Sequence, residues 1–416
     1  MAVKNFLLEI AAKNREKIFK YLDTSELREK LEKHVKEKWR KYTPNATEPV
    51  PIAGVDGSVN TVEFKTFSVY AAVGYSLERN NGKIEEHIAG DVGVISTPNV
   101  QDVVRLIREI CELKASLMST AELILHDGSM MSLLIPPIPL LDKEGGLKEV
   151  YEKLKTDYGE EVIGSLRHQL EALKSTIKGA KTLYEPFAST KLLGFDAVGP
   201  YPSDSLMLLL YAEKLFTLGM ILEERISKSN NSGVAFVSKT SRSKQYVEDL
   251  LMELQKADES AKAPYINDMA LFELFTDREP GYSHPISFPM VYSSESTRYI
   301  KRSLLDYGIL GKILNQYFGN LDLLITYIRL EKNGPVAKLE IPVPSGLSDK
   351  SRVKIVENFM DVLYTISHRG YPPILTLVDT SSKIHREDIK RLISVLGIMP
   401  EFTGREVLEE WEMWIL

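Results

Sequence analysis

Two apolar segments of the chain end in the same tripeptide, Asp-Gly-Ser, and this repeat constrains the fold more than any other feature. The first segment is residues 51–58, with its acid at Asp56, and the second is residues 123–129, with its acid at Asp127. An apolar segment that runs into a glycine and a small polar residue is typical of a strand opening into a turn. One such tripeptide is more often a plain polar turn. Because the design is repeated, we expect two neighbouring strands that end at Asp56 and Asp127.

The segments around these two acids predict the order strand, strand, strand, helix, strand. We expect a second strand from about residue 64 to 75 and a third over 84–88, joined at the turn Asn80-Asn81-Gly82. Apolar side chains recur at spacings of three and four over residues 100–118, which predicts an amphipathic helix. This order is that of a ribonuclease-H-like α/β core with a mixed sheet, in which acids of the first strand, the fourth strand and the helix share metal ions.

The rest of the chain reads as large helical insertions in this one α/β unit. Residues 3–42 predict a helical hairpin broken at Thr24 and Ser25, followed by a linker over 43–50. We divide the chain into a helical arm (1–45), an α/β domain with helical insertions (46–400) and a tail (401–416). Beyond the core we expect a Pro-rich loop over 130–146, helices over 147–177, 203–227, 244–257, 351–368 and from 386, and strands over 234–239, 323–330, 336–341 and ending at 379.

Charge and cysteine content restrict the class of protein. The formal net charge is -6, whereas a protein that coats nucleic acid by charge alone is normally basic. Nucleic acid would therefore need a local basic groove or a partner that delivers it. The one cysteine, Cys111, excludes an intrachain disulfide and fits a reducing compartment. The N-terminal residues lack the apolar stretch of a signal peptide, and the longest apolar runs are short for a bilayer, so we expect a cytoplasmic protein without membrane attachment.

Carboxylates at the ends of two neighbouring strands provide the oxygen ligands that Mg²⁺ and Mn²⁺ prefer. The helix over 100–118 must supply a third acid, and helical spacing leaves both Glu109 and Glu112 open. Three or four acids around one or two ions suit phosphodiester hydrolysis. The seven histidines lack paired spacing and there is one cysteine, which disfavours zinc. The sequence also lacks a P-loop, a dinucleotide-binding glycine motif and a G-x-S-x-G nucleophile motif.

Three further residues are candidates for the same site. Lys239 follows an apolar strand and could bind a phosphate or the charge that develops in the transition state. Tyr371 precedes Pro372 and could stack on a base or orient a phosphate. Asp379 is expected as a third acid at a strand end. Each has a structural alternative: an ordinary strand-end lysine, a tyrosine packed beside a turn, and a polar strand terminus.

In their order along the chain, these motifs resemble the NurA nucleases over roughly residues 50–395. The resemblance is carried by Val55–Ser58, Glu112–Leu113, Leu125–Ser129, Phe236–Arg242, Tyr327–Leu330 and Gly370–Pro372, and more loosely by Phe272–Thr276. It implies a ribonuclease-H-like core and a manganese-dependent nuclease, with Mg²⁺ as the alternative ion. It implies 5′-to-3′ exonuclease activity on DNA and endonuclease activity on single strands. It also implies a homodimer that works with a hexameric HerA translocase in archaeal DNA-end resection for double-strand break repair.

By motif, the resemblance gives metal-ligand roles to Asp56, Glu112 and Asp127, which favours Glu112 over Glu109, and Tyr371 matches an active-site tyrosine. Many members carry histidine where this chain has Asp379. Aspartate can also ligate a hard cation, but it adds negative charge and cannot act as an imidazole. Two alternative functions are open. One is a non-catalytic subunit that binds the hexameric translocase and DNA ends, and the other is a ribonuclease of the same fold. The helical arm and the pair Trp411 and Trp414 are candidate dimer or partner surfaces.

Overall fold

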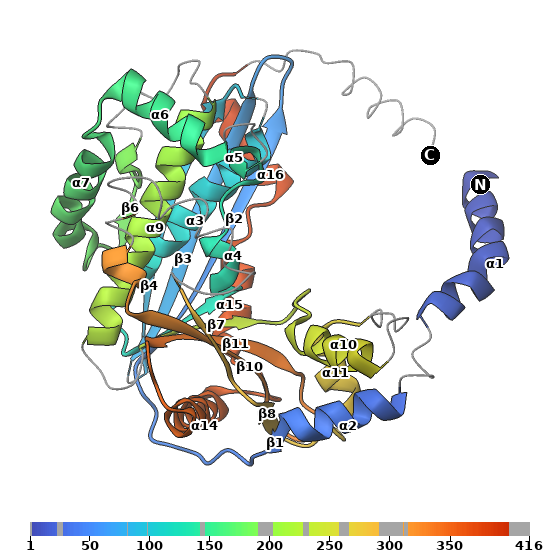
Figure 1. Ribbon diagram of the computed structural model, residues 1–416. Coiled ribbons are helices and arrows are strands. Elements are labelled where there is room, and N and C mark those ends of the chain that lie inside the picture. The colour runs from blue at the N-terminus through green and yellow to red at the C-terminus, as the bar shows by residue number, and fades with distance from the viewer. Residues whose placement is uncertain are drawn as a thin grey trace.

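One large mixed sheet runs through the described part of the chain (Figure 1). The computed structural model describes residues 2–22, 28–80, 82–97, 99–141, 146–189, 203–227, 233–257, 266–290, 311 and 315–398. Among these residues the strand order is β1-β8-β10-β11-β7-β5-β2-β3-β4-β6, and β9 pairs with β10. The strands are β1 (Trp39–Lys41), β2 (Ile52–Glu63), β3 (Ser68–Asn80), β4 (Lys83–Ile95), β5 (Leu123–Asp127), β6 (Thr182–Leu183), β7 (Val234–Ser238), β8 (Gly281–Ser283), β9 (Ile286–Pro289), β10 (Leu321–Arg329) and β11 (Ala337–Pro344).

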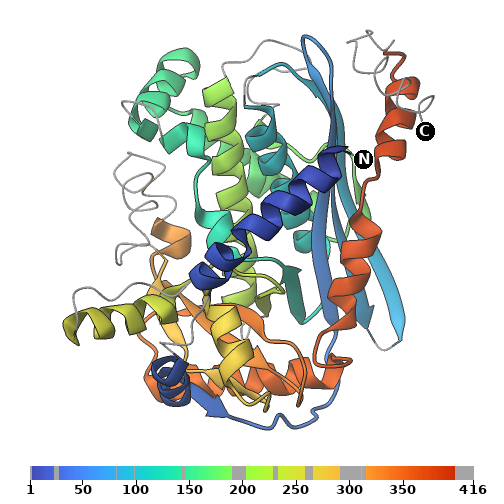
Figure 2. The same ribbon diagram turned by 90° about the vertical axis from the view of Figure 1, so that its right-hand side faces the viewer.

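Helices cover both faces of the central strands (Figures 1 and 2). The helices are α1 (Ala2–Leu22), α2 (Arg28–Lys38), α3 (Val100–Met118), α4 (Met130–Leu134), α5 (Ile138–Leu141), α6 (Gly146–Tyr158), α7 (Val162–Ile177), α9 (Ser203–Ser227), α10 (Gln245–Ala257), α11 (Asp268–Phe275), α14 (Asp349–Ile366), α15 (Pro373–Ser382) and α16 (Arg386–Val395). One apolar core joins α3, α6, α7 and α9 to one face of the sheet, and a second joins α14 and α15 to the other. The central strands are therefore buried on both sides, as apolar runs of this kind require.

The predicted order of strand, strand, strand, helix, strand is confirmed. β2, β3 and β4 form an antiparallel meander, α3 crosses over, and β5 returns parallel to β2. β7 then pairs parallel to β5. The turn after Asn80 is also confirmed, with Gly82 at a φ of 80°. The central strands are longer than expected, because β3 pairs with β2 from Ile52 to Glu63. The expectation that the first strand ends at Asp56 is therefore wrong.

A pair of glycines lets α3 lie directly on the sheet. Gly57 of β2 and Gly74 of β3 are opposite each other in the antiparallel register. A Cβ atom at Gly74 would lie 2.1 Å from the backbone carbon of Cys111 and 2.2 Å from the backbone nitrogen of Glu112. Real side chains cannot occupy such positions. The glycine pair thus brings the middle of α3 against β2 and β3 at the level of Asp56.

Several predicted elements differ in detail. The segment 147–177 is two helices, because Gly159 with a φ of 90° ends α6. The expected loop over 130–146 contains the short helices α4 and α5. The expected strand ending at Asp379 is wrong, since these residues form α15. Pro373 stands at its first helical position, where proline is favoured.

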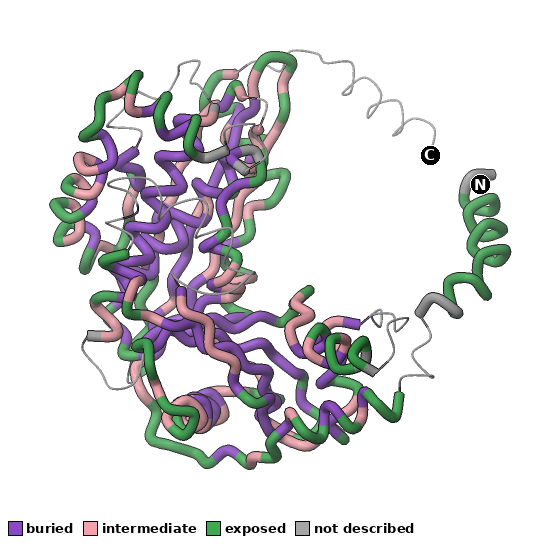
Figure 3. The backbone as a smooth tube through the Cα atoms, in the orientation of Figure 1, coloured by how far each residue is buried: buried purple, intermediate pink, exposed green. Residues whose placement is uncertain are grey.

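The N-terminal segment is not a packed hairpin. α2 packs against α11 and is followed by β1, but every described side chain of α1 from Lys4 to Phe19 is exposed (Figure 3). The tail with Trp411 and Trp414 lies outside the described residues. In the part of the chain that the structure describes, one stretch, Asp204–Ile226, is long and apolar enough to cross a membrane by length and composition. That stretch is fully buried inside the protein, as expected for a core helix.

Candidate active site

The parallel pairing of β2 and β5 brings Asp56 and Asp127 side by side. The register joins Val55 to His126, so the next residue of each strand is one of the two acids. β5 ends at Asp127, whereas β2 continues to Glu63, so the two acids lie where the pairing between β2 and β5 stops. Both side chains are partly buried. Strand alternation places Asp56 on the face covered by α15, where Ser382 donates a hydrogen bond of 3.3 Å to its Oδ2.

Glu112 approaches the same place from the opposite face, on α3. Its side chain is buried, with His126 Nδ1 at 3.5 Å from its Oε1. A Cβ atom at Gly57 would lie 3.2 Å from Glu112 Oε2. Because glycine has no Cβ atom, the Glu112 carboxylate has space at this position. His126 is held in turn by stacking on Phe236 at 4.6 Å and by Ser116 Oγ at 3.0 Å from its Nε2. His126 therefore positions Glu112, a role that the sequence did not predict.

Glu109, the other acid that helical spacing left open, has a different partner. It is buried, and Lys214 of α9 donates a hydrogen bond of 2.9 Å to its Oε2. One turn further, Lys114 and Glu213 form a second buried ion pair between the same two helices. These pairs fix α3 against α9, so Glu109 is part of the helix packing.

Asp379 reaches the site from a helix and not from a strand end. It lies on α15, which packs on β2 and β3, and Lys383 one turn later lies 3.4 Å from its Oδ2. Leu375 and Val378 face the core, which leaves Asp379 partly exposed toward the acids. Four carboxylates from four elements thus act on one another's surroundings electrostatically, and the element that carries Asp379 is a helix where the sequence predicted a strand.

Burial and neighbouring carboxylates raise the pKa values of Asp56 and Asp127. Burial, followed by the negative charge of Glu112, raises the pKa of Asp56 from 3.8 to about 7, and Asp127 and Asp379 contribute in the same direction. Burial also raises the pKa of Asp127, with smaller contributions from Asp379 and Glu112, while the hydrogen bond from Lys239 opposes the shift. Such a cluster holds more negative charge than its own cations balance.

Lys239 and Tyr371 form the wall of the site next to Asp127. The Lys239 ammonium donates a hydrogen bond of 2.9 Å to Asp127 Oδ2 and lies 5.1 Å from the centre of the Tyr371 ring. The Tyr371 hydroxyl is buried, and no described residue is its hydrogen-bond partner. Burial and the nearby aspartates raise the pKa of this hydroxyl, so it stays protonated and can donate to a substrate oxygen.

The serines of the two Asp-Gly-Ser segments hold the surroundings of the acids in place, which the sequence did not predict. Ser58 Oγ accepts a hydrogen bond of 3.2 Å from the backbone nitrogen of Ile384, just after α15. Ser129 Oγ donates to both carboxylate oxygens of the buried Glu340 on β11, at 3.0 and 2.9 Å. Each serine therefore ties an acid-bearing segment to a distant part of the chain.

Replacing Ser129 by alanine tests this anchoring. Glu340 stays paired with Lys338 but loses the hydroxyl, and we expect a destabilisation of about 1–2 kcal/mol in chemical denaturation. The matched control is Ser132→Ala, because Ser132 Oγ donates only to a backbone oxygen within its own turn and is exposed. Equal and small losses for both variants would contradict an anchoring role for Ser129.

The carboxylate oxygens of the four acids are suitable ligands for a hard divalent ion, although the side chains do not surround one point. Within the described ranges, no group of three acidic, histidine or cysteine side chains is arranged to hold a metal ion. Asp56 and Glu112 approach from opposite faces of the sheet and repel each other, as the raised pKa of Asp56 indicates. Four carboxylates with one lysine bound to Asp127 and one near Asp379 nevertheless form an oxygen-rich, electronegative region. These residues fit Mg²⁺ or Mn²⁺ better than zinc.

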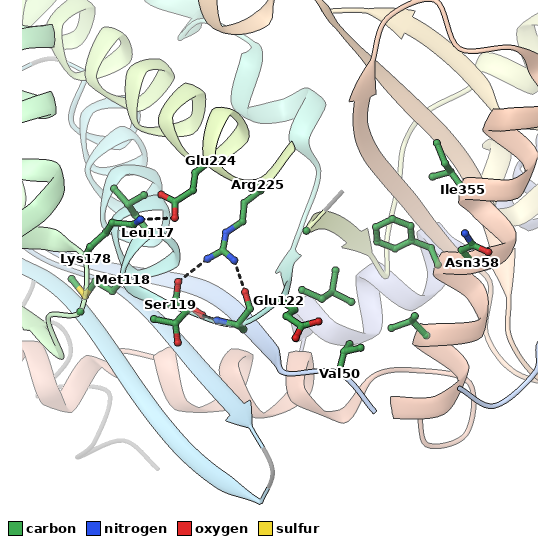
Figure 4. Close-up of a pocket in the computed structure, with 17 residues that line it drawn as sticks. Val50, Leu117, Met118, Ser119, Glu122, Lys178, Glu224, Arg225, Ile355 and Asn358 are labelled. Atoms are coloured by element: carbon green, nitrogen blue, oxygen red, sulfur yellow. Dashed lines mark hydrogen bonds and ion pairs between the residues drawn. The ribbon is translucent and has the colours of Figure 1, made fainter. Parts of the chain in front are cut away.

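A cavity of about 590 Å³ lies away from the acids, at the opposite end of β5 (Figure 4). Arg225 of α9 lines one side and donates to the carbonyl oxygens of Ser119 and Ala121, and Ile355 and Asn358 of α14 line the other. None of the four site acids lines this cavity. The candidate active site at the acids is therefore separate from this cavity.

Comparison with known proteins finds similarity over most of the chain. A family model described as NurA domain matches residues 50–384. Two relatives come from Methanocaldococcus jannaschii: an uncharacterized protein, 26% identical over 374 residues (84% of this chain, 83% of the relative), and a probable DNA double-strand break repair nuclease NurA, 24% identical over 403 residues (94% and 89%). The fold is similar to the crystal structure of the NurA nuclease from Sulfolobus solfataricus, with a TM-score of 0.62, 20% identity and coverage of 95% and 96%. It is also similar to a crystal structure of NurA bound to dAMP and manganese, with a TM-score of 0.60, 16% identity and coverage of 94% and 97%.

Proposed function

The chain belongs to the NurA family, and on this premise we propose that it is a divalent-metal-dependent nuclease that hydrolyses DNA phosphodiester bonds in double-strand break repair. The observation that carries the proposal is that the negative charges of Glu112 and Asp379, which come from separate elements, act on both Asp56 and Asp127, and that the charge of Asp127 acts on Asp56. A relative named as a probable repair nuclease and a NurA structure with dAMP and manganese support it. Without a cation, carboxylates this close together repel one another at neutral pH, and a bound divalent ion would reduce that repulsion.

We assign the metal-ligand roles to Asp56, Glu112, Asp127 and Asp379, with Mn²⁺ or Mg²⁺ as the ion. When bound, the ion supplies a Lewis acid that activates water and stabilises the leaving oxygen. Lys239 and the protonated Tyr371 hydroxyl lie beside Asp127, where they can hold the phosphate and neutralise the charge that develops on its oxygens. This chain has the carboxylate of Asp379 where many family members have an imidazole. Asp379 can therefore hold an ion or accept a proton from water, but it adds no positive charge.

We also propose the finer properties that the family resemblance implies. These are a ribonuclease-H-like core, 5′-to-3′ exonuclease activity, endonuclease activity on single strands, a homodimer, and a hexameric HerA-type translocase as partner in a cytoplasmic, archaeal repair system. The partial order β4-β3-β2-β5-β7, with β5 and β7 parallel to β2, supports the core assignment. The exposed apolar side chains of α1, among them Phe6 and Phe19, fit a protein that works in an assembly.

A direct assay tests the proposed function. End-labelled single- and double-stranded DNA and a single-stranded RNA of the same sequence are incubated with the purified protein and Mn²⁺ or Mg²⁺. We expect cleavage of DNA with Mn²⁺ and none in EDTA. Preferred cleavage of RNA would favour a ribonuclease. Binding of DNA ends without cleavage under any divalent metal would favour a non-catalytic subunit.

Metal binding is expected to depend on pH in a direction that the Asp56 pKa fixes. In the folded protein the Asp56 carboxyl keeps its proton up to about pH 7, whereas an ordinary aspartate loses its proton near pH 3.8. Without metal, the free energy of unfolding therefore falls as the pH rises between these two values. A cation that replaces the proton binds more tightly above pH 7. We expect Mn²⁺ or Mg²⁺ to raise the melting temperature by several degrees at pH 8 and by clearly less at pH 5.5. An equal rise at both pH values would contradict this assignment.

A further inference from the structure

Arg108 lies beside the acid cluster on the α3 side of β2. It stands one helical turn before Glu112. A Cβ atom at Gly57 would lie 3.1 Å from Arg108 Cγ and 3.2 Å from Glu112 Oε2, so these two side chains meet at one point of the sheet next to Asp56. The Arg108 side chain is 34% exposed. Its guanidinium group can therefore reach solvent at the edge of the site.

Part of the hydrogen-bonding capacity of Arg108 is not used by the described residues. Its Nε is buried and has no partner among them. Its nearest acid is Glu109, where the Arg108 terminal nitrogen lies 3.6 Å from Oε1, too far for a hydrogen bond. The other oxygen of Glu109 already accepts from Lys214 at 2.9 Å. Glu109 is thus shared between a buried lysine at 2.9 Å and Arg108 at 3.6 Å, and its pairing with Arg108 is the longer of the two.

The other two cations at the site are bound to its acids. Lys239 lies 2.9 Å from Asp127 and Lys383 lies 3.4 Å from Asp379. Arg108 differs from both, because it lies next to Glu112 and, among the described residues, forms no ion pair with any of the four site acids. In a chain with a net charge of -6, a phosphate group needs such a local cation to approach the acids at all.

We propose that Arg108 binds a backbone phosphate of the DNA strand next to the bond that is cleaved, an inference that rests on the proposed nuclease function. A guanidinium group presents five donors in a planar fork that matches two phosphate oxygens. Its position on the α3 face, opposite Lys239 and Tyr371 on the α15 face, lets the two groups of donors hold different phosphates of one strand. Arg108 is a substrate-positioning residue that fixes the register of the strand against Asp56 and Glu112.

Binding of a single-stranded oligonucleotide tests this role. In the Asp56→Asn background with EDTA, Arg108→Ala is expected to weaken binding roughly tenfold and to reduce the slope of log affinity against log salt by about 0.7, the value for one phosphate contact on a single strand. In the metal-loaded protein with Asp56 intact, the same change is expected to raise KM more than it lowers kcat. The matched control is Arg105→Ala on the same helix, whose charge pairs with Asp102 at 3.2 Å; we expect it to change affinity less than threefold.

Oligonucleotides with one methylphosphonate at successive positions identify the contacted phosphate. Removing that charge is expected to weaken binding by the parent protein at one or two positions and to have little effect there on Arg108→Ala. Arg108→Lys should keep the salt slope and recover part of the affinity. The proposal is overturned if Arg108→Ala keeps the slope and remains as sensitive as the parent at every position. If the unaltered protein neither binds nor cleaves DNA with Mn²⁺, the proposed function fails first and the inference fails with it.

Discussion

Replacing Asp56 by asparagine is expected to reduce manganese-dependent DNA cleavage by roughly 10³-fold or more while the protein stays folded. Asp56 lies at the centre of the cluster, because the charges of Glu112, Asp127 and Asp379 all raise its pKa. Asparagine keeps the size of the side chain but provides a weaker, uncharged ligand for a divalent ion. The measurement is the initial rate of oligonucleotide cleavage at saturating Mn²⁺, with circular dichroism to establish folding.

The matched control is Asp91→Asn on β4. Asp91 is also a partly buried aspartate with a raised pKa, but its partner is the hydroxyl of Tyr70, and it is not among the charges that act on Asp56. We expect nearly full activity for this variant. In metal-free buffer at pH 8, Asp56→Asn should be at least as stable as the unaltered protein, because it removes a repelled carboxylate. Full activity of Asp56→Asn would remove the basis of the proposed function.

Replacing Gly74 by alanine is expected to destabilise the protein by about 3 kcal/mol or more, although it adds only one methyl group. That methyl would lie 2.1 Å from the backbone carbon of Cys111, and backbone cannot rotate away as a side chain can. α3 would have to move off the sheet, and Glu112 would move with it. We therefore expect weaker Mn²⁺ binding in addition to a lower midpoint in chemical denaturation.

Gly90→Ala on the neighbouring strand β4 is the control for this change. Its added methyl would lie 3.3 Å from the carbonyl oxygen of Ala72, a tight contact that small shifts can accommodate. We expect a loss below about 1 kcal/mol and unchanged Mn²⁺ binding. If Gly74→Ala is equally mild, α3 does not depend on the glycine pair for its place on the sheet.

Elements with a strong periodic pattern could be predicted from the sequence alone. The apolar stripe of α3 predicted its bounds at Val100 and Met118, and the turn signal after Asn80 placed the β3–β4 hairpin. The prediction for residues 373–379 was wrong, because a short apolar run reads equally well as a strand or as a helix that begins at Pro373. The end of β2 was also misplaced, since its extension beyond Asp56 depends on pairing with β3 and not on its own residues.

The sequence by itself determined which chemistry is available: repeated acids beside apolar strands, without the ligands for zinc or the loop for a nucleotide. Only the tertiary structure decided how those acids are placed. Local spacing could not choose between Glu109 and Glu112, because the choice depends on Lys214 in α9, about a hundred residues further along the chain. Nor could it reveal that Gly57 and Gly74 face each other beneath α3. Contacts between distant segments depend on register and packing, which have no periodic signature in either segment alone.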